Sequence, residues 1–237
     1  MFNPYMFRGF YFDKTYLLVL AGIIITMIAQ ANIQKAFGKY SKIKSKKSIT
    51  GFAAAKYILD TNSYDDISIK RVRGSLSDYF NPASKEIALS DSSFKDTSIA
   101  SIAVACHECG HVIQYKEGYT PLRIKSWIVP AVNFGSRLSF PIILLGVLMA
   151  NQTFINIGLI LFSLILIFQL ITLPVEFDAS RRALRVMEAS GMLVGEEIGH
   201  ARKMLRAAAY TYLAATLSTA LQFLRLFLLF GNRNNRD

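Results

Sequence analysis

Residues 138–175 form a run of 38 residues without a charged side chain. A helix needs about 20 apolar residues to cross a lipid bilayer, so this run predicts two crossings. Asn151-Gln152-Thr153 lies within it and is typical of a tight turn. Such a hairpin requires lipid as its solvent. The run therefore constrains the fold more than any other feature of the chain.

Two more uncharged runs cover residues 15–34 and 207–224. Together with the hairpin they predict four membrane-spanning helices at about 15–34, 127–150, 154–175 and 207–230. A mean hydropathy of +0.33 and 52% hydrophobic residues agree with an integral membrane protein. Arg8, Lys14 and Ala29-Gln30-Ala31 also give the first run the pattern of a cleaved signal peptide. The lysine cluster that follows the run favours a retained anchor instead.

The charged residues predict the orientation of the chain in the membrane. The net charge is +11, and the polar regions 35–126 and 176–206 hold 21 of the 27 Lys and Arg residues. Positive charge marks cytoplasmic segments, so both regions are expected in the cytoplasm of a multi-pass cell-membrane protein with both termini outside. The residues left on the other side are Arg8, Lys14, Arg233 and Arg236. No stripe of interleaved basic and aromatic residues indicates nucleic-acid binding, and the lipid bilayer is the expected partner.

The polar region 35–126 has the pattern of a small α+β structure. Residues 51–59 indicate a short helix, and 66–70 and 86–90 indicate strands. A helix is expected from Ile99 to about Tyr115, capped by Asp96, Thr97 or Ser98. Gly118 and Pro121 are expected to end this helix.

That helix carries His107-Glu108-Cys109-Gly110-His111, which holds two of only three histidines in the chain. At about 100° per residue, His107 and His111 point within roughly 40° of each other. This H-E-x-x-H spacing indicates zinc-dependent hydrolysis, with Glu108 as the general base. Cys109 points to the opposite side and Cys106 about a third of a turn away, so both cysteines are interpreted as packing residues.

A catalytic zinc ion needs three protein ligands. Glu117 stands where a local third ligand would follow the motif, but the pattern around it is poor because Gln114 replaces the usual glycine. Glu176 directly follows the hairpin, and two crossings return the chain to the side of the motif. The small residues Ala179, Ser180 and Ala183 share its face, and Ala100 and Ala103 share the ligand face of the motif helix. The alternative role for Glu176 is an acid at a helix N-terminus.

The expected reaction is hydrolysis of a peptide bond in a membrane or membrane-proximal polypeptide, with one Zn²⁺ per chain. The oxyanion would need a hydrogen-bond donor. The candidates are Tyr212, Arg137, Tyr210 and His200. Arg137 has an alternative role as an interfacial residue that reaches out to solvent. The 86–90 strand is either a partner for the substrate backbone or a purely structural strand.

Several motifs of this chain resemble the YugP-type membrane zinc metallopeptidases of bacteria. They are Lys39-Tyr40-Ser41-Lys42, Tyr79-Phe80-Asn81-Pro82, Ala105-Cys106-His107-Glu108-Cys109-Gly110-His111 with Gln114, Leu173-Pro174-Val175-Glu176-Phe177-Asp178-Ala179-Ser180 and Ala207-Ala208-Ala209-Tyr210-Thr211-Tyr212. The resemblance covers nearly the whole chain and implies a zinc peptidase. The expected fold is then a mainly α integral membrane protein, a single domain over 1–237 with about four transmembrane helices and a small zincin-like α+β catalytic region.

The chain is more distantly similar to HtpX and CAAX-protease-type membrane gluzincins, in which a membrane hairpin also separates the motif from a glutamate ligand. In those proteins an aspartate four residues after the glutamate supports the site. Here Ser180 takes that position, and the nearby acid is Asp178. Asp178 points away from Glu176 on a regular helix, so either Ser180 or a kink near Pro174 would have to resolve the difference.

Two other functions are compatible with the motif. One is an intramembrane site-2-type protease, although Lys95, Asp96, Lys116 and Glu117 bracket the motif helix with charge. The other is a non-enzymatic membrane protein with a structural zinc ion. A structural ion is normally held by four protein ligands, and no fourth ligand is evident. The sequence leaves the oligomeric state open.

Overall fold

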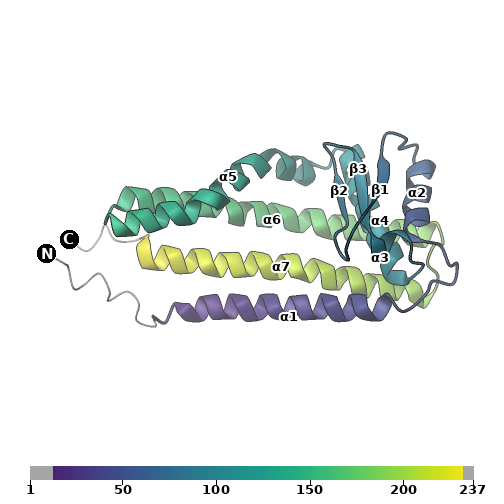
Figure 1. The fold of residues 1–237 in the computed structure, drawn as a ribbon, viewed down its shortest axis with the longest axis horizontal. Coiled ribbons are helices and arrows are strands. Elements are labelled where there is room, and N and C mark those ends of the chain that lie inside the picture. Colours follow the sequence, from purple (N-terminus) through teal and green to yellow (C-terminus); the bar gives the residue numbers. More distant parts are fainter. Residues whose placement is uncertain (1–12, 232–237) are drawn as a thin grey trace. The chain divides into compact units, whose positions relative to one another are not determined.

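The fold is described by a computed structural model over residues 13–231. Seven helices and three strands follow one another along the chain (Figure 1): α1 Tyr16–Tyr40, α2 Gly51–Thr61, β1 Ser68–Val72, β2 Tyr79–Asn81, β3 Glu86–Ser90, α3 Asp91–Phe94, α4 Ile99–Lys116, α5 Thr120–Leu148, α6 Gln152–Ala189 and α7 Glu196–Phe230. Arg8, Arg233 and Arg236, which were expected outside the membrane, lie beyond the described residues.

Four of these helices, α1, α5, α6 and α7, are long and apolar enough to cross a membrane. They match the four expected spans in number and order. Each is longer than its apolar run, because helical structure continues into the flanking polar residues. Their length and composition are those of a membrane protein.

The described residues divide into two compact units. The helical unit comprises residues 13–28, 128–170 and 213–231, and the mixed unit comprises residues 29–127 and 171–212. The expectation of a single domain stays a prediction.

Close backbone contacts hold the α5–α6 hairpin of the helical unit together. A Cβ atom added to Gly146 would lie 2.7 Å from the backbone nitrogen of Ile155, and one added to Gly158 would lie 2.9 Å from the backbone oxygen of Ser139. Small residues allow this approach between membrane helices. Asn151 caps α6, since its side-chain oxygen accepts a hydrogen bond from the Thr153 backbone at 3.0 Å. The predicted turn therefore lies where the hairpin reverses.

The mixed unit contains a three-stranded sheet in the order β1-β3-β2. β3 is the central strand, parallel to β1 and antiparallel to β2. The sequence pattern identified β1 approximately and β3 correctly, but it missed β2, which is too short for a visible alternation. Since β3 has a neighbour on each side, its backbone is not available to a substrate, and that alternative from the sequence is wrong.

The main hydrophobic core lies in the mixed unit around α4. Buried side chains of α2, β3, α4, α6 and α7 form one cluster, which includes Ile58, Leu89, Ile102, Met187 and Met204. Ser98 is the residue that caps α4, because its hydroxyl accepts a hydrogen bond from the Ser101 backbone at 3.2 Å. The motif helix is therefore a buried element of a folded core.

Two helix boundaries differ from the expectation. Pro121 does not end the motif helix but lies in the first turn of α5. A proline is tolerated there, because a backbone N–H in the first turn has no partner within the helix. α6 continues through Pro174 to Ala189. Glu176 is thus inside a helix, and the alternative of an acid at a helix N-terminus is wrong.

Candidate metal centre

The centre depends on a close contact between α4 and α6 in the mixed unit. A Cβ atom added to Gly110 would lie 2.4 Å from the backbone oxygen of Ala179. Only glycine allows this distance between the two backbones. Ala179 and Ala183 are fully buried on α6, as expected from the small residues of this face. The contact brings Glu176 over the two histidines of α4.

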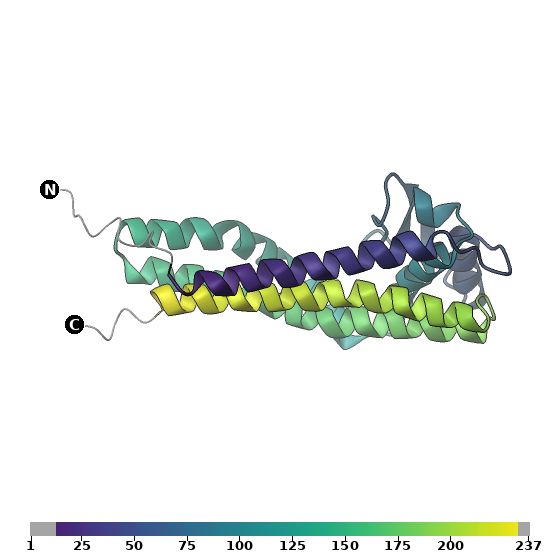
Figure 2. The same ribbon diagram turned by 90° about the horizontal axis from the view of Figure 1, so that it is seen from below.

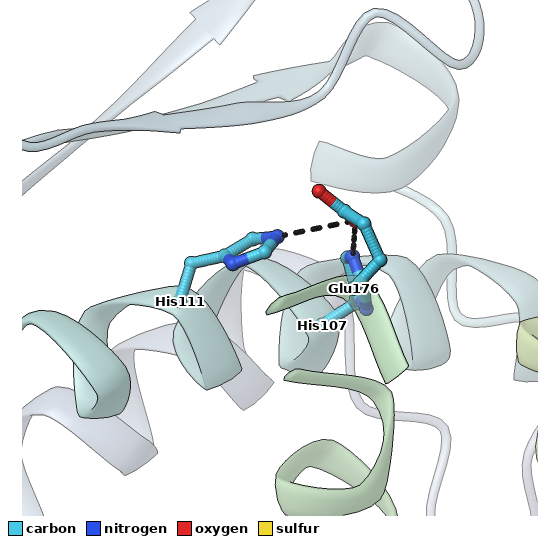
Figure 3. A group of neighbouring side chains, drawn as sticks. All are labelled: His107, His111 and Glu176. Atoms are coloured by element: carbon cyan, nitrogen blue, oxygen red, sulfur yellow. Dashed lines mark ion pairs between the residues drawn. The ribbon is translucent and has the colours of Figure 1, made fainter. Parts of the chain in front are cut away.

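His107, His111 and Glu176 form a group that could hold a metal ion, with their ligand atoms all within 4.8 Å of one another. In Figure 3 both imidazole rings rise from α4 and converge on the carboxylate from α6. Glu176 Oε2 lies 3.4 Å from His107 Nε2 and 3.5 Å from His111 Nε2. The Glu176 side chain is only 4% exposed.

The two distances from Glu176 Oε2 to the imidazole nitrogens are close to the ligand spacing around a zinc ion. Ligands placed 2.0–2.1 Å from a tetrahedral ion lie about 3.3 Å from one another. In addition, Glu176 Oε2 is buried and makes no hydrogen bond of normal geometry. A buried carboxylate oxygen without such a partner is costly, and a cation bound between it and the two Nε2 atoms would satisfy it. The donor set of two imidazoles and one carboxylate is one that zinc uses in catalytic sites.

Hydrogen bonds on the far side of each ring set the histidine orientation. His107 Nδ1 lies 3.2 Å from Ser180 Oγ, and His111 Nδ1 lies 3.0 Å from Gln114 Oε1. When each Nδ1 carries the proton and donates it, each Nε2 is left with a free lone pair toward the metal. Such partners typically orient metal-binding histidines and increase their basicity.

Asp178 is connected to the centre through Gln114. The Gln114 side-chain nitrogen donates to Asp178 Oδ2 at 2.9 Å and to the Val175 backbone oxygen at 2.8 Å. Arg181 and Arg182 also pair with Asp178. Ser180 and Asp178 therefore lie behind different histidines, so both sequence candidates for supporting residues lie near the centre. The sequence motif that contains Gln114 does not indicate this hydrogen-bonded link to the candidate metal ligands.

Glu108 lies buried beside this group. The pKa of Glu108 is raised from 4.5 to about 7, mainly by burial and also by the nearby carboxylates of Glu176 and Asp78, although His107 and a backbone hydrogen bond from Phe80 favour the charged form. A carboxyl that titrates near neutrality is suited to accept and return a proton. Asp78 is fixed by hydrogen bonds from Ser90, and no sequence pattern distinguishes this residue.

Lys125 also contacts the candidate metal group. Its ammonium nitrogen donates to Glu176 Oε1 at 3.1 Å, so the two oxygens of this carboxylate face different groups. Oε1 faces Lys125, and Oε2 faces the imidazoles. A lysine in a mixed stretch at the start of α5 carries no sequence pattern that distinguishes it. This arrangement favours coordination of a metal by one carboxylate oxygen.

A cavity of about 280 Å³ opens beside the group and is lined by His107, Glu108, Glu176 and Tyr212, among others. The Tyr212 hydroxyl donates a hydrogen bond to the Glu176 carboxylate. The other donor candidates lie elsewhere: Tyr210 accepts a hydrogen bond from Arg206 at 3.0 Å, and the His200 ring packs against Tyr40. Arg137 belongs to the helical unit, and its role stays a prediction.

Three other sequence candidates are engaged in separate contacts. Glu117 pairs with Arg182 and is not part of the group around the histidines. Cys106 and Cys109 are buried and not disulfide-bonded. The Cys109 thiol contacts the Ala55 backbone oxygen at 3.9 Å. These positions agree with the interpretation of both cysteines as packing residues.

Comparison with known proteins gives matches over most of the chain. Residues 15–231 match the family model described as "Putative neutral zinc metallopeptidase". A curated relative from Bacillus subtilis (strain 168), "Putative membrane protease YugP", is 39% identical over 220 residues, covering 93% of this chain and 98% of the relative. No solved structure matches the chain. The family match covers the three residues of the candidate metal centre and all four apolar helices, and the chain therefore belongs to the YugP-type family of neutral zinc metallopeptidases.

Proposed function

We propose that this protein is a zinc-dependent endopeptidase that cleaves membrane or membrane-proximal polypeptides. The observation that carries the proposal is Glu176 Oε2, a buried oxygen without a regular hydrogen bond that faces both histidine Nε2 atoms. The family and the name of the bacterial relative support a zinc protease. His107, His111 and Glu176 would hold one zinc ion per chain.

The bound ion would supply Lewis acidity, which polarises the scissile carbonyl and makes water nucleophilic near neutral pH. Glu108 would accept the proton of the attacking water and pass it to the nitrogen of the leaving amine. The Tyr212 hydroxyl lines the same cavity and is the best-placed candidate to donate a hydrogen bond to the oxyanion. Ser180 and Gln114 would keep the two imidazoles in the tautomer that leaves Nε2 free.

β2 is the edge strand of the sheet next to Glu108. β3 occupies one side of β2, and the Phe80 backbone interacts with Glu108. An extended peptide that paired with this edge would pass close to the general base. We therefore propose that β2 (Tyr79–Asn81), rather than the 86–90 strand, pairs with the substrate backbone.

We place the centre on the cytoplasmic side of the cell membrane. The mixed unit contains the polar regions 35–126 and 176–206, in which most Lys and Arg residues are found, and positive charge favours retention in the cytoplasm. Substrates would then be segments at the cytoplasmic surface of the bilayer. A protease sensitivity assay on sealed vesicles of known orientation, using the loop between β1 and β2, would locate the unit.

The decisive experiment is the zinc content of the detergent-purified protein, compared with Glu176→Ala and Glu108→Gln. We expect about one zinc per chain in the wild type and in Glu108→Gln, and a loss of affinity of more than about 100-fold in Glu176→Ala. Full zinc in Glu176→Ala would exclude Glu176 as a ligand and return attention to Glu117.

Glu108→Gln separates catalysis from a structural role for the metal. The amide cannot accept the proton, so we expect peptide cleavage to fall by about 10²- to 10⁴-fold while zinc stays bound. In the residues that the structure describes, the group offers three ligands, which leaves one coordination position open as in catalytic sites. Unchanged cleavage in this variant would contradict the proposed mechanism.

A further inference from the structure

A second cavity of the mixed unit lies between the end of α1 and the start of α7. Its volume is about 370 Å³, and four cationic side chains line it: Lys35, Lys39, Lys203 and Arg206. None of its nine lining residues is a carboxylate. Figures 1 and 2 both show these parts of α1 and α7 side by side, and the Tyr40 and His200 rings join them with their centroids 5.2 Å apart.

These four cations have no anionic partner in the described part of the chain, because the ion pairs of residues 13–231 involve other lysines and arginines. Arg206 is held in place by a neutral contact, a hydrogen bond of 3.0 Å to the Tyr210 hydroxyl. Four like charges around one cavity repel one another, and a bound anion would remove that repulsion. The cavity therefore favours an anionic ligand.

The position of the cavity along both helices indicates what kind of anion fits. Lys35 is the first charged residue after the uncharged run 15–34, and Arg206 is the last before the run 207–224. The cavity is thus at the boundary between polar and apolar sequence on two neighbouring helices at once. Tyr40 and Tyr210 also line it, and tyrosines are enriched at the headgroup level of membranes.

We propose that this cavity binds the phosphate headgroup of an anionic phospholipid. Basic residues next to a membrane helix are the usual partners of such headgroups. Other residues of the same two helices, among them Ile33 and Ala208, line the cavity of the metal centre. A bound lipid would therefore stabilise two helices that border the proposed active site. The proposal does not depend on the protease function.

The test uses the full chain, delipidated in a non-ionic detergent and titrated with phosphatidylglycerol while bound lipid is counted by native mass spectrometry. Lys203→Ala/Arg206→Ala removes two exposed cations from the cavity. Arg73→Ala/Lys95→Ala is the matched control, because it removes two exposed cations of the mixed unit elsewhere. We expect affinity to fall roughly 30-fold in the cavity variant and to stay unchanged in the control.

Three further measurements distinguish binding of an anionic lipid from an effect on folding, from binding of any phospholipid and from binding of a soluble anion. Lys203→Arg/Arg206→Lys keeps both charges and should bind like the wild type. Equal losses in the cavity variant and the control would overturn the proposal, as would equal binding of phosphatidylcholine. Displacement of the lipid by millimolar inorganic phosphate would also overturn it, since the cavity would then be a site for a soluble anion.

Discussion

The two units of this protein bury their side chains in different ways. In the helical unit the buried hydrophobic cluster consists of Ile143, Ile155 and Leu159, while large residues such as Phe140 and Ile160 remain exposed. In the mixed unit a single cluster extends through α2, β3, α4, α6 and α7. A unit with so many exposed apolar residues needs lipid around it, whereas the other builds a core as a protein does in water.

The units also differ in what their polar groups do. In the mixed unit Gln114, Asp178 and Ser180 are buried, and each is hydrogen-bonded to another member of the metal centre or to the backbone. Buried polar networks of this kind fix one arrangement, because an unpaired group inside the protein is costly. We infer from this comparison that the helical unit anchors the chain in the membrane, while the mixed unit holds the side chains of the proposed metal centre in a fixed geometry.

The largest expected effect on stability comes from replacing an exposed apolar residue by a charged one in each of the two units. Ile160 is 63% exposed in the helical unit, and Tyr57 is 51% exposed on α2 of the mixed unit. Ile160→Lys places a charge in the hydrocarbon region and should cost about 2.5–3.5 kcal/mol. Tyr57→Lys should change stability by less than about 0.5 kcal/mol.

The fraction of protein that remains in the membrane after alkaline extraction would measure the effect of Ile160→Lys, and thermal unfolding in detergent would measure that of Tyr57→Lys. If both variants behaved alike, the exposed face of the helical unit would not be a lipid-facing surface.

The next effect concerns the glycines that let helices touch in each unit. Gly110→Ala would force α4 away from Ala179, and Gly158→Ala would crowd the hairpin at Ser139. Each should destabilise the protein by about 1–3 kcal/mol through overpacking. Of these two variants, only Gly110→Ala should also lower zinc affinity, because the Gly110–Ala179 contact brings α6 next to the histidines, whereas Gly158 lies in the hairpin.

Gly199→Ala is the control for the glycine series, since a Cβ atom there meets nothing within 4 Å. This variant should be neutral or stabilised by up to about 1 kcal/mol. Melting temperature and zinc affinity, measured on all three variants, separate the outcomes. A normal zinc affinity in Gly110→Ala would show that the α4–α6 contact does not set the centre.

A smaller effect is expected from the hydrogen bond behind His107. Ser180→Ala removes the hydroxyl that faces His107 Nδ1 and should lower zinc affinity by about 10- to 100-fold with little change in stability. Ser77→Ala, which removes an exposed hydroxyl bonded to the Arg73 backbone, is the matched control. Competition with a zinc chelator would measure both, and equal affinities would exclude a supporting role for Ser180.

The smallest effect is expected at Lys125. Its ammonium group shares the Glu176 carboxylate with the proposed metal and repels a cation, so Lys125→Met should raise zinc affinity by several-fold. The side chain is 24% exposed, and solvent screening keeps the change small. Chelator competition against Lys125→Arg, which keeps the charge, is the comparison. A lower affinity in Lys125→Met would show that Lys125 mainly holds the carboxylate in position.

Much of the fold was predictable because it rests on local patterns. The uncharged runs indicated α1, α5, α6 and α7, and the capping residues before Ile99 indicated the start of α4. The H-E-x-x-H spacing places His107 and His111 on one face of any helix, whatever surrounds it. β2 could not be found in this way, since its three residues are paired only through contacts with β3.

The residues around the proposed metal were partly hidden for the same reason. Glu176 could be proposed from the number of membrane crossings and the small residues beside it. Lys125 and Asp78 carry no local pattern, because each acquires its role only through a carboxylate or a strand distant in the chain. The alternative interpretation of Glu176 as an acid at a helix N-terminus is wrong because α6 continues through Pro174.

The sequence by itself determined that this chain needs a membrane and that one helix presents two histidines and a glutamate, since hydrophobic length and helical period are local properties. Only the tertiary structure decided which acid meets the histidines and what holds each ring. That choice depends on the distance between α4 and α6, set by the contact of Gly110 with Ala179, and such a distance is a property of packed surfaces rather than of any single segment.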